Sequence, residues 1–182
     1  MNYIFIGVAV ALVVWFIIVY NLFVKDRNLI KEAWSGIDVQ LKRRHNLIPG
    51  LVETVKAYSK YERALFNEIT EQRTKTIRLE NIKDKATAEN DISGKLKSLF
   101  AVVEDYPDLK ANVNFLDLQN QLTEVEDQLQ YARRYYNGTV RNYNIRVESF
   151  PSNLIANIFE FKPEEFFEIS LATERRTPEV KI

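Results

Sequence analysis

The sequence predicts an all-α fold in which an N-terminal transmembrane helix is followed by an antiparallel up-and-down four-helix bundle. Three observations favour this fold. The chain of 182 residues starts with a long uncharged apolar run. It contains only five Gly and five Pro, and scarce helix breakers suit long helices better than turn-rich β structure. After the run, apolar residues recur at spacings of three and four, which is the helical period.

The apolar run extends from Tyr3 to Val24, and Lys25 is the first charged residue. A helix needs roughly 20 apolar residues to cross a bilayer core. A cleavable signal peptide is the alternative, but it would have basic residues before the run and small residues at a cleavage site. The sequence shows neither feature. We therefore expect residues 1–25 to form an uncleaved membrane anchor.

Flanking charge predicts the orientation of this anchor. Lys25, Arg27 and Lys31 follow the run, whereas no Lys or Arg precedes it. Basic residues favour the cytoplasmic side of a membrane. We expect the N-terminus to lie outside and the remainder of the chain to lie in the cytoplasm.

Residues 26–150 are predicted to form the helical bundle. Their apolar residues fall into four stripes, separated by charged and amide residues that suit a solvated face. The stripes are Ile30, Trp34, Ile37 and Leu41; Val52, Val55, Tyr58, Leu65 and Ile69; Ile92, Leu96, Leu99 and Val103; and Phe115, Leu118, Leu122, Val125, Leu129, Ala132, Tyr136, Val140, Tyr143 and Val147. The fourth stripe begins with the alternating spacing of a coiled coil, so we expect its tyrosines to lie in the core.

Polar or proline-containing segments predict where these helices end. The first break is expected at residues 81–85. The second is expected at Tyr106-Pro107-Asp108, because proline disfavours helix at the residue before it and Asp108 can cap the next helix. Phe150-Pro151 is expected to end the fourth helix.

Pro49-Gly50 permits two interpretations. The apolar phase continues from Leu41 through Ile48 to Val52, which favours one kinked helix. However, an unbroken helix over residues 26–79 would be about 80 Å long, and the third helix would cover less than half of it. We favour a break near residues 46–48, because four helices can then pack side by side.

Residues 151–182 are predicted to form a short apolar helix and a mixed-charge tail that is mobile near its end. If the fourth helix returns toward the bilayer, this short helix lies near the lipid surface. Its candidate interaction residues are Leu154, Ile158, Phe159 and Phe161. They could contact the membrane or a partner, or they could cover the end of the bundle, since exposed apolar patches are uncommon.

Lys42, Arg43 and Arg44 form a second candidate interaction site. Such a basic cluster could meet anionic lipid or an acidic partner. Alternatively, it is a solvated face or pairs with acidic residues of the next helix. His45 is the only histidine, and we expect it to lie at the surface or at a helix end rather than to bind a metal.

Several classes of function lack support in the sequence. The 25 basic residues balance 25 acidic ones, which gives no electrostatic reason to expect nucleic acid as the partner. The chain has no Cys, and neither a phosphate-binding lysine loop nor a serine nucleophile motif is present. We expect no catalytic activity, no cofactor, no bound metal and no small-molecule substrate.

Seven sequence blocks are spread along nearly the whole chain: residues 20–24 (YNLFV), 33–44 (AWSGIDVQLKRR), 47–52 (LIPGLV), 104–111 (EDYPDLKA), 114–115 (NF), 131–137 (YARRYYN) and 150–153 (FPSN). In this order they resemble the LemA family of bacterial membrane proteins. The resemblance implies a single-pass protein of the bacterial inner (cell) membrane, with its N-terminus outside and an antiparallel four-helix bundle. The resemblance does not imply an activity, because the family has no settled biochemical function.

These expectations together predict a membrane-anchored scaffold or adaptor. Its partners would be the lipid bilayer and unidentified proteins, which include further copies of the chain. The alternative is a self-associating protein that shapes or organises the membrane.

Overall fold

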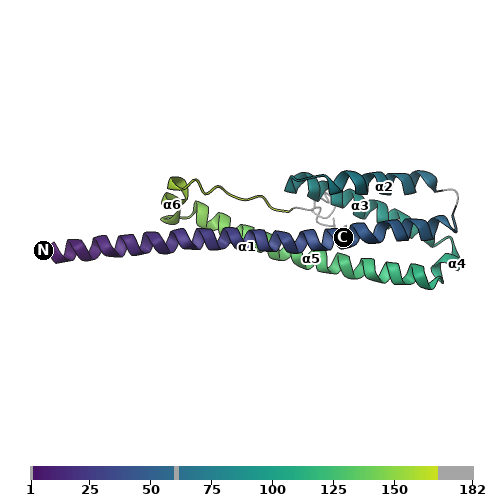
Figure 1. The fold of residues 1–182 in the computed structure, drawn as a ribbon, viewed down its shortest axis with the longest axis horizontal. Coiled ribbons are helices and arrows are strands. Elements are labelled where there is room, and N and C mark those ends of the chain that lie inside the picture. The colour runs from purple at the N-terminus through teal and green to yellow at the C-terminus, as the bar shows by residue number, and fades with distance from the viewer. Residues whose placement is uncertain (1, 60–61, 168–182) are drawn as a thin grey trace, which may run out of the picture. The chain divides into compact units, whose positions relative to one another are not determined.

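The computed structural model describes residues 2–59 and 62–167, and within these two ranges all regular structure is helical. The helices are α1 (Asn2–Lys56), α2 (Arg63–Ile77), α3 (Ile82–Val103), α4 (Pro107–Lys110), α5 (Val113–Glu148) and α6 (Ser152–Ile158) (Figure 1). The predicted all-α class is confirmed. Most of the tail expected to be mobile, residues 168–182, lies outside the described residues.

The chain divides into two compact units. Of the described residues, one unit contains 2–38 and 130–166, and the other contains 39–59, 62–129 and Phe167. Helices α1 and α5 therefore each contribute one segment to each unit. We call the first the anchor unit and the second the bundle unit.

The start of α1 has the properties of a membrane span. Its 18-residue apolar window has a mean hydropathy of 2.7, and only 6% of that window is buried. A core helix of a soluble protein would be mostly covered by other segments, whereas side chains such as Phe5 (72% exposed) and Leu12 (61% exposed) are uncovered here. In the described part of the chain, α1 is the one helix long and apolar enough to span a bilayer.

The bundle unit packs four helical segments up and down: residues 39–56 of α1, then α2, α3 and residues 113–129 of α5 (Figure 1). Contacts between neighbouring segments show that they are antiparallel. The Lys56 ammonium lies over the Phe66 ring near the turn between α1 and α2. Lys95 pairs with Glu68 between α2 and α3.

Apolar side chains from all of these segments form the core of the bundle unit. It consists of Ile48, Leu51, Val52, Val55, Phe66, Ile69, Ile92, Leu96, Leu99, Val103, Leu109, Phe115 and Leu122. Most of these residues belong to the predicted apolar stripes. Burial of each large side chain contributes about 1.5–3 kcal/mol relative to full exposure.

The predicted break at residues 46–48 is wrong, because α1 continues through Pro49 to Lys56. Proline has no N–H to donate to the carbonyl four residues earlier, which is that of His45. Arg73 of α2 donates its Nε–H to this His45 oxygen, at 2.7 Å. A side chain from the neighbouring helix thus replaces the missing helical hydrogen bond, and the chain turns after Lys56 instead.

Asparagine side chains cap two of the later helices. Asn81 Oδ1 accepts hydrogen bonds from the backbone N–H groups of Lys83 and Asp84 at the start of α3. Asn112 Oδ1 accepts from the Phe115 N–H at the start of α5. The expectation that Asp108 caps the fourth helix is wrong, because the single turn α4 intervenes and moves the start of α5 to Val113.

The anchor unit pairs the first part of α1 with the second part of α5, and α6 lies beside this pair (Figure 1). Its interior contains Val19, Phe23, Ile30, Ala33, Ile37, Tyr136, Val140, Tyr143, Ile155, Ala156 and Phe161. The predicted end of the fourth helix before Phe150-Pro151 is confirmed, since α5 ends at Glu148.

Candidate functional site

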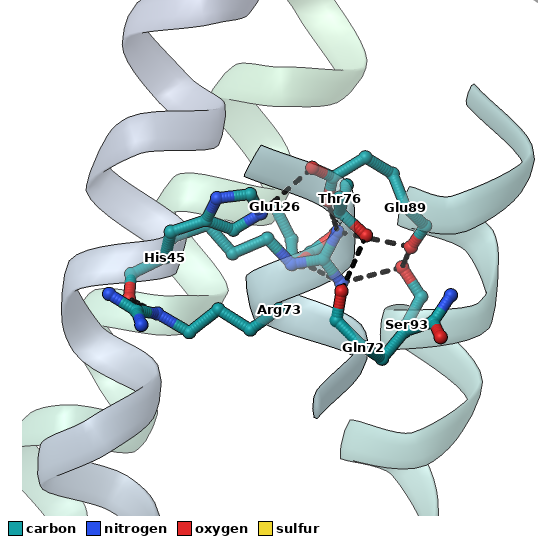
Figure 2. A network of polar contacts seen from close by, with 8 residues as sticks. His45, Gln72, Arg73, Thr76, Glu89, Ser93 and Glu126 are labelled. Atoms are coloured by element: carbon teal, nitrogen blue, oxygen red, sulfur yellow. Dashed lines mark hydrogen bonds and ion pairs between the residues drawn. The ribbon is translucent and has the colours of Figure 1, made fainter. Parts of the chain in front are cut away.

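A network of buried charged groups crosses the bundle unit. Arg44 of α1 is fully buried. Its Nη1 lies 3.2 Å from Glu89 Oε2 of α3, and its Nη2 lies 2.9 Å from Glu126 Oε1 of α5. Nη2 also donates a 2.6 Å hydrogen bond to Ser93 Oγ. Figure 2 shows side chains from all four helical segments of the unit converging at this place.

Glu89 is the centre of this network. It is fully buried, and its Oε1 lies 2.8 Å from His45 Nε2, an ion pair whenever the imidazole is protonated. Neither this oxygen nor Glu126 Oε1 makes a hydrogen bond of good geometry, so both contacts are mainly electrostatic. Removing one member of a buried ion pair leaves an uncompensated charge and costs about 3–5 kcal/mol.

The network residues occupy the helical phase of the core. Arg44 lies three residues after Leu41 and four before Ile48, and both of these neighbours are buried. In the same way, Glu89 precedes Ile92 by three residues and Glu126 precedes Leu129 by three. Helical periodicity therefore directs Arg44 and Glu89 inward, while the Glu126 side chain keeps 38% of its surface exposed. Their position in an apolar stripe is the sequence signal that could have identified the network.

The structure corrects the expectation for His45, which is buried within α1, neither at the surface nor at a helix end. For Arg44 it supports the alternative of pairing, because acidic residues of α3 and α5 contact the buried guanidinium. Lys42 and Arg43 are exposed, and Arg43 lies 3.7 Å from Glu124. Their role as an interaction site stays a prediction.

A pocket of about 260 Å³ opens beside the buried network. Its lining is Arg44, Ser93, Leu96, Lys97, Phe100, Leu122, Thr123 and Glu126. The Arg44 charge at this pocket is already compensated by two carboxylates. Within residues 2–59 and 62–167, no group of three or more His, Cys, Asp or Glu side chains is placed to hold a metal ion.

Aromatic rings gather in the anchor unit where the apolar run of α1 ends. Phe161 stacks on Phe23, with ring centroids 4.7 Å apart and an interplanar angle of 14°. Phe159 lies 4.7 Å from the Tyr20 ring and 5.8 Å from the Phe16 ring. The segment after α6 is thus packed against α1 by rings at alternate positions.

Two side chains of α5 hold the backbone that follows these rings. Asn144 Nδ2 donates to the Glu164 carbonyl, and Asn144 Oδ1 accepts from the Glu164 N–H, both at 2.9 Å. Tyr136 donates its hydroxyl proton to the Glu165 carbonyl, at 2.9 Å. Burial, followed by the carboxylates of Glu164 and Glu165, raises the pKa of the Tyr136 hydroxyl to about 12.

The four apolar candidates near α6 separate into two groups. Phe161 is buried against α1 and covers part of the anchor unit. Leu154, Ile158 and Phe159 keep 51%, 65% and 43% of their surface exposed. Sequence reasoning missed the Asn144 contacts, because a polar residue between stripe positions gives no sign of which backbone it will bind.

The fold and these sites define a class: helical-bundle proteins with one candidate membrane span and a buried charge network. The chain belongs to the LemA family, whose family model matches residues 33–182. This match confirms the resemblance inferred from the sequence blocks.

Three relatives illustrate the range of similarity. The magnetosome protein MamQ 2 of Paramagnetospirillum magneticum is 26% identical over 185 residues, which cover 87% of this chain and 68% of the relative. Protein LemA of Metamycoplasma hominis is 26% identical over 154 residues, with 82% and 69% covered. The magnetosome protein MamQ of Magnetospirillum gryphiswaldense is 22% identical over 184 residues, with 87% and 68% covered.

Proposed function

We propose that this protein is a single-pass membrane anchor for a helical scaffold or adaptor, and that it binds partners rather than catalysing a reaction. One observation carries the proposal. The exposed apolar window at the start of α1 belongs to the same helix that later supplies core residues such as Leu51 and Val55 to the bundle unit. The helix that meets lipid is therefore also a structural part of the bundle.

The chemistry of the buried network supports a binding role. Arg44, Glu89 and Glu126 compensate one another inside the bundle unit. A catalytic acid or base must reach a substrate proton at hydrogen-bond distance, whereas Glu89 is fully buried. The network thus serves to specify how the helices pack, a role attested for buried polar groups in other bundles.

We further propose that the chain lies in the inner membrane of a bacterium with its N-terminus outside and the bundle unit in the cytoplasm, because basic residues follow the span. Single-cysteine variants test this topology cleanly, since the chain has no Cys. We expect Tyr3→Cys to react with a membrane-impermeant maleimide on intact cells and Ser98→Cys to react only after permeabilisation. The reverse pattern would overturn the proposed orientation.

Photo-crosslinking in the native membrane tests the scaffold role. A crosslinking residue is placed at Lys42, in the exposed basic cluster, and at Ser98 as an exposed control on α3. We expect a discrete protein adduct from position 42 and none from position 98. Absence of a discrete adduct from position 42, or equal adducts from positions 42 and 98, would contradict an adaptor that binds through this cluster.

Self-association that organises the membrane is a second candidate, and exposed side chains on α5 favour it. Tyr131, Tyr135 and Ile145 are 61%, 53% and 55% exposed. With Gly138 and Asn142 between them, these positions alternate spacings of four and three, as in a coiled-coil seam. The two MamQ relatives described above are named magnetosome proteins, and we extend a membrane-organising role to this chain as part of the proposal.

Sedimentation of the full chain in detergent distinguishes the two candidates. Self-association predicts a mass that rises with concentration and falls when Tyr131 and Tyr135 are both replaced by Ser. A concentration-independent monomer would exclude this second candidate and leave the scaffold proposal intact.

A further inference from the structure

The exposed apolar residues around α6 lie at the level of the candidate span. Phe159 contacts the Phe16 and Tyr20 rings, and both of these residues precede Lys25, the first charged residue of the chain. The nine residue steps from Phe16 to Lys25 correspond to a helical rise of about 13 Å. Phe159 therefore packs on a part of α1 that a spanning helix places among acyl chains.

The side chains of α6 show two different surroundings. Ile155 and Ala156 are buried, with 1% of the surface of each exposed. Leu154 and Ile158 share a face of the helix, since residues four apart are neighbours, and they are 51% and 65% exposed. Phe150, just before α6, is 78% exposed. One face thus packs on the protein, and another presents large apolar groups outward.

Charged residues limit how deeply this segment can enter a bilayer. Glu148 ends α5, and Glu160 and Lys162 follow α6; all three are exposed. Asp26, just after the span, pairs with Arg146 of α5, with Arg146 Nε 2.7 Å from Asp26 Oδ2. These groups suit the headgroup region, whereas the apolar face of α6 suits the adjoining acyl chains.

We propose that α6 and Phe159 form a second membrane contact, lying in the interface beside the span with Leu154 and Ile158 against the acyl chains of the same leaflet. The occupant of this apolar face is lipid, because Phe159, directly after α6, packs on the Phe16 and Tyr20 rings of the candidate span. The inference rests on the proposed anchoring of α1 in a bilayer.

Nitroxide accessibility in vesicles tests this contact. The full chain is reconstituted in vesicles of phosphatidylethanolamine and phosphatidylglycerol, and one nitroxide is attached at Leu154→Cys or Ile158→Cys. Both residues are exposed, so labelling leaves the core intact. Val13→Cys in the span and Ile77→Cys on α2 are matched controls, with 59% and 51% of the native side chains exposed.

We expect relaxation of the labels at 154 and 158 to be several-fold more sensitive to oxygen, which partitions into lipid, than to a water-soluble nickel chelate. Position 13 should behave in the same way, and position 77 should show the opposite preference.

A label at 158 that prefers the nickel chelate while position 13 prefers oxygen would overturn this inference alone. Protection of the label at 158 from both reagents would show a second copy of the chain on this face and would also overturn the inference. A water-exposed label at 13 would overturn the anchor itself.

Discussion

Arg73 donates a hydrogen bond to the carbonyl oxygen of His45, the backbone acceptor that Pro49 leaves without its helical donor. The contact explains why α1 continues past a proline that would otherwise favour its end. A proline inside a helix removes one backbone hydrogen bond and costs about 3 kcal/mol. Here a guanidinium from the neighbouring helix α2 offsets part of this cost.

Replacing Arg73 by Met removes the donor and retains much of the aliphatic stem. We expect the free energy of unfolding to fall by about 1–2 kcal/mol, because the His45 carbonyl loses its partner. In a Pro49→Ala background the alanine N–H can supply that bond, so the same substitution should cost measurably less. Denaturant unfolding of the four chains of this double-mutant cycle measures the coupling. Equal costs in both backgrounds would show that Arg73 and Pro49 act independently and would contradict the prediction. Arg78→Met, at an exposed position, is the control.

Glu89→Gln should destabilise the bundle unit strongly. The substitution leaves Arg44 buried with only Glu126 as a charged partner, and we expect a loss of about 3 kcal/mol. Glu124→Gln is the matched control, since Glu124 is 60% exposed and 3.7 Å from Arg43. Its effect should stay below about 1 kcal/mol. Thermal unfolding compares the two, and similar losses would contradict an organising role for the buried network.

Asn144→Ala should release the segment that follows α6. Its amide makes two hydrogen bonds to the backbone of Glu164, and their loss exposes that backbone to solvent. We expect hydrogen exchange of the Glu164 amide to accelerate, while exchange in the middle of α5 stays unchanged. Asn142→Ala, at an exposed position of the same helix, should leave hydrogen exchange of the Glu164 amide slow. Unchanged protection in Asn144→Ala would mean that other contacts hold the segment.

Tyr136 predicts a loss of stability at high pH. Its pKa is raised from 10.0 to about 12 in the folded chain, so folding favours the protonated hydroxyl. The resulting stabilisation is complete below the unfolded value and disappears as the pH rises through the folded one. The free energy of unfolding should fall between about pH 10 and pH 12, and Tyr136→Phe should flatten this fall. Tyrosinate absorbance should lose a late-titrating component in Tyr136→Phe, and an unchanged absorbance titration would contradict the prediction.

The uncharged apolar run predicted the candidate span, and helical periodicity predicted the helical class and most of the core. The same rule contained the signal for the buried network, because Arg44, Glu89 and Glu126 lie in phase with buried neighbours. Residues 42–44 are three successive basic residues, but Arg44 alone faces inward. Their prediction as one basic cluster therefore missed the difference between buried Arg44 and exposed Lys42 and Arg43. Charge type and helical phase together therefore separate a buried ion pair from a surface patch.

Two features depended on contacts that local sequence cannot reveal. The position of the first turn was mispredicted, because the effect of Pro49 depends on Arg73, which lies on another helix. The hydrogen bonds between Asn144 and the Glu164 backbone join residues twenty positions apart. Both contacts arise from packing between segments that are distant in the sequence. A single sequence does not show which residues of two such segments lie opposite each other.

Alkaline carbonate extraction of membranes that contain the full chain tests the central claim, a membrane-spanning start of α1, most directly. We predict that the wild-type chain stays in the membrane pellet and that a Val13→Asp, Ile17→Asp double variant appears in the soluble fraction, because charged residues at the centre of a span oppose insertion. Val39→Asp, at an exposed position in the bundle unit, should stay in the pellet. Release of the wild-type chain by carbonate would contradict the account.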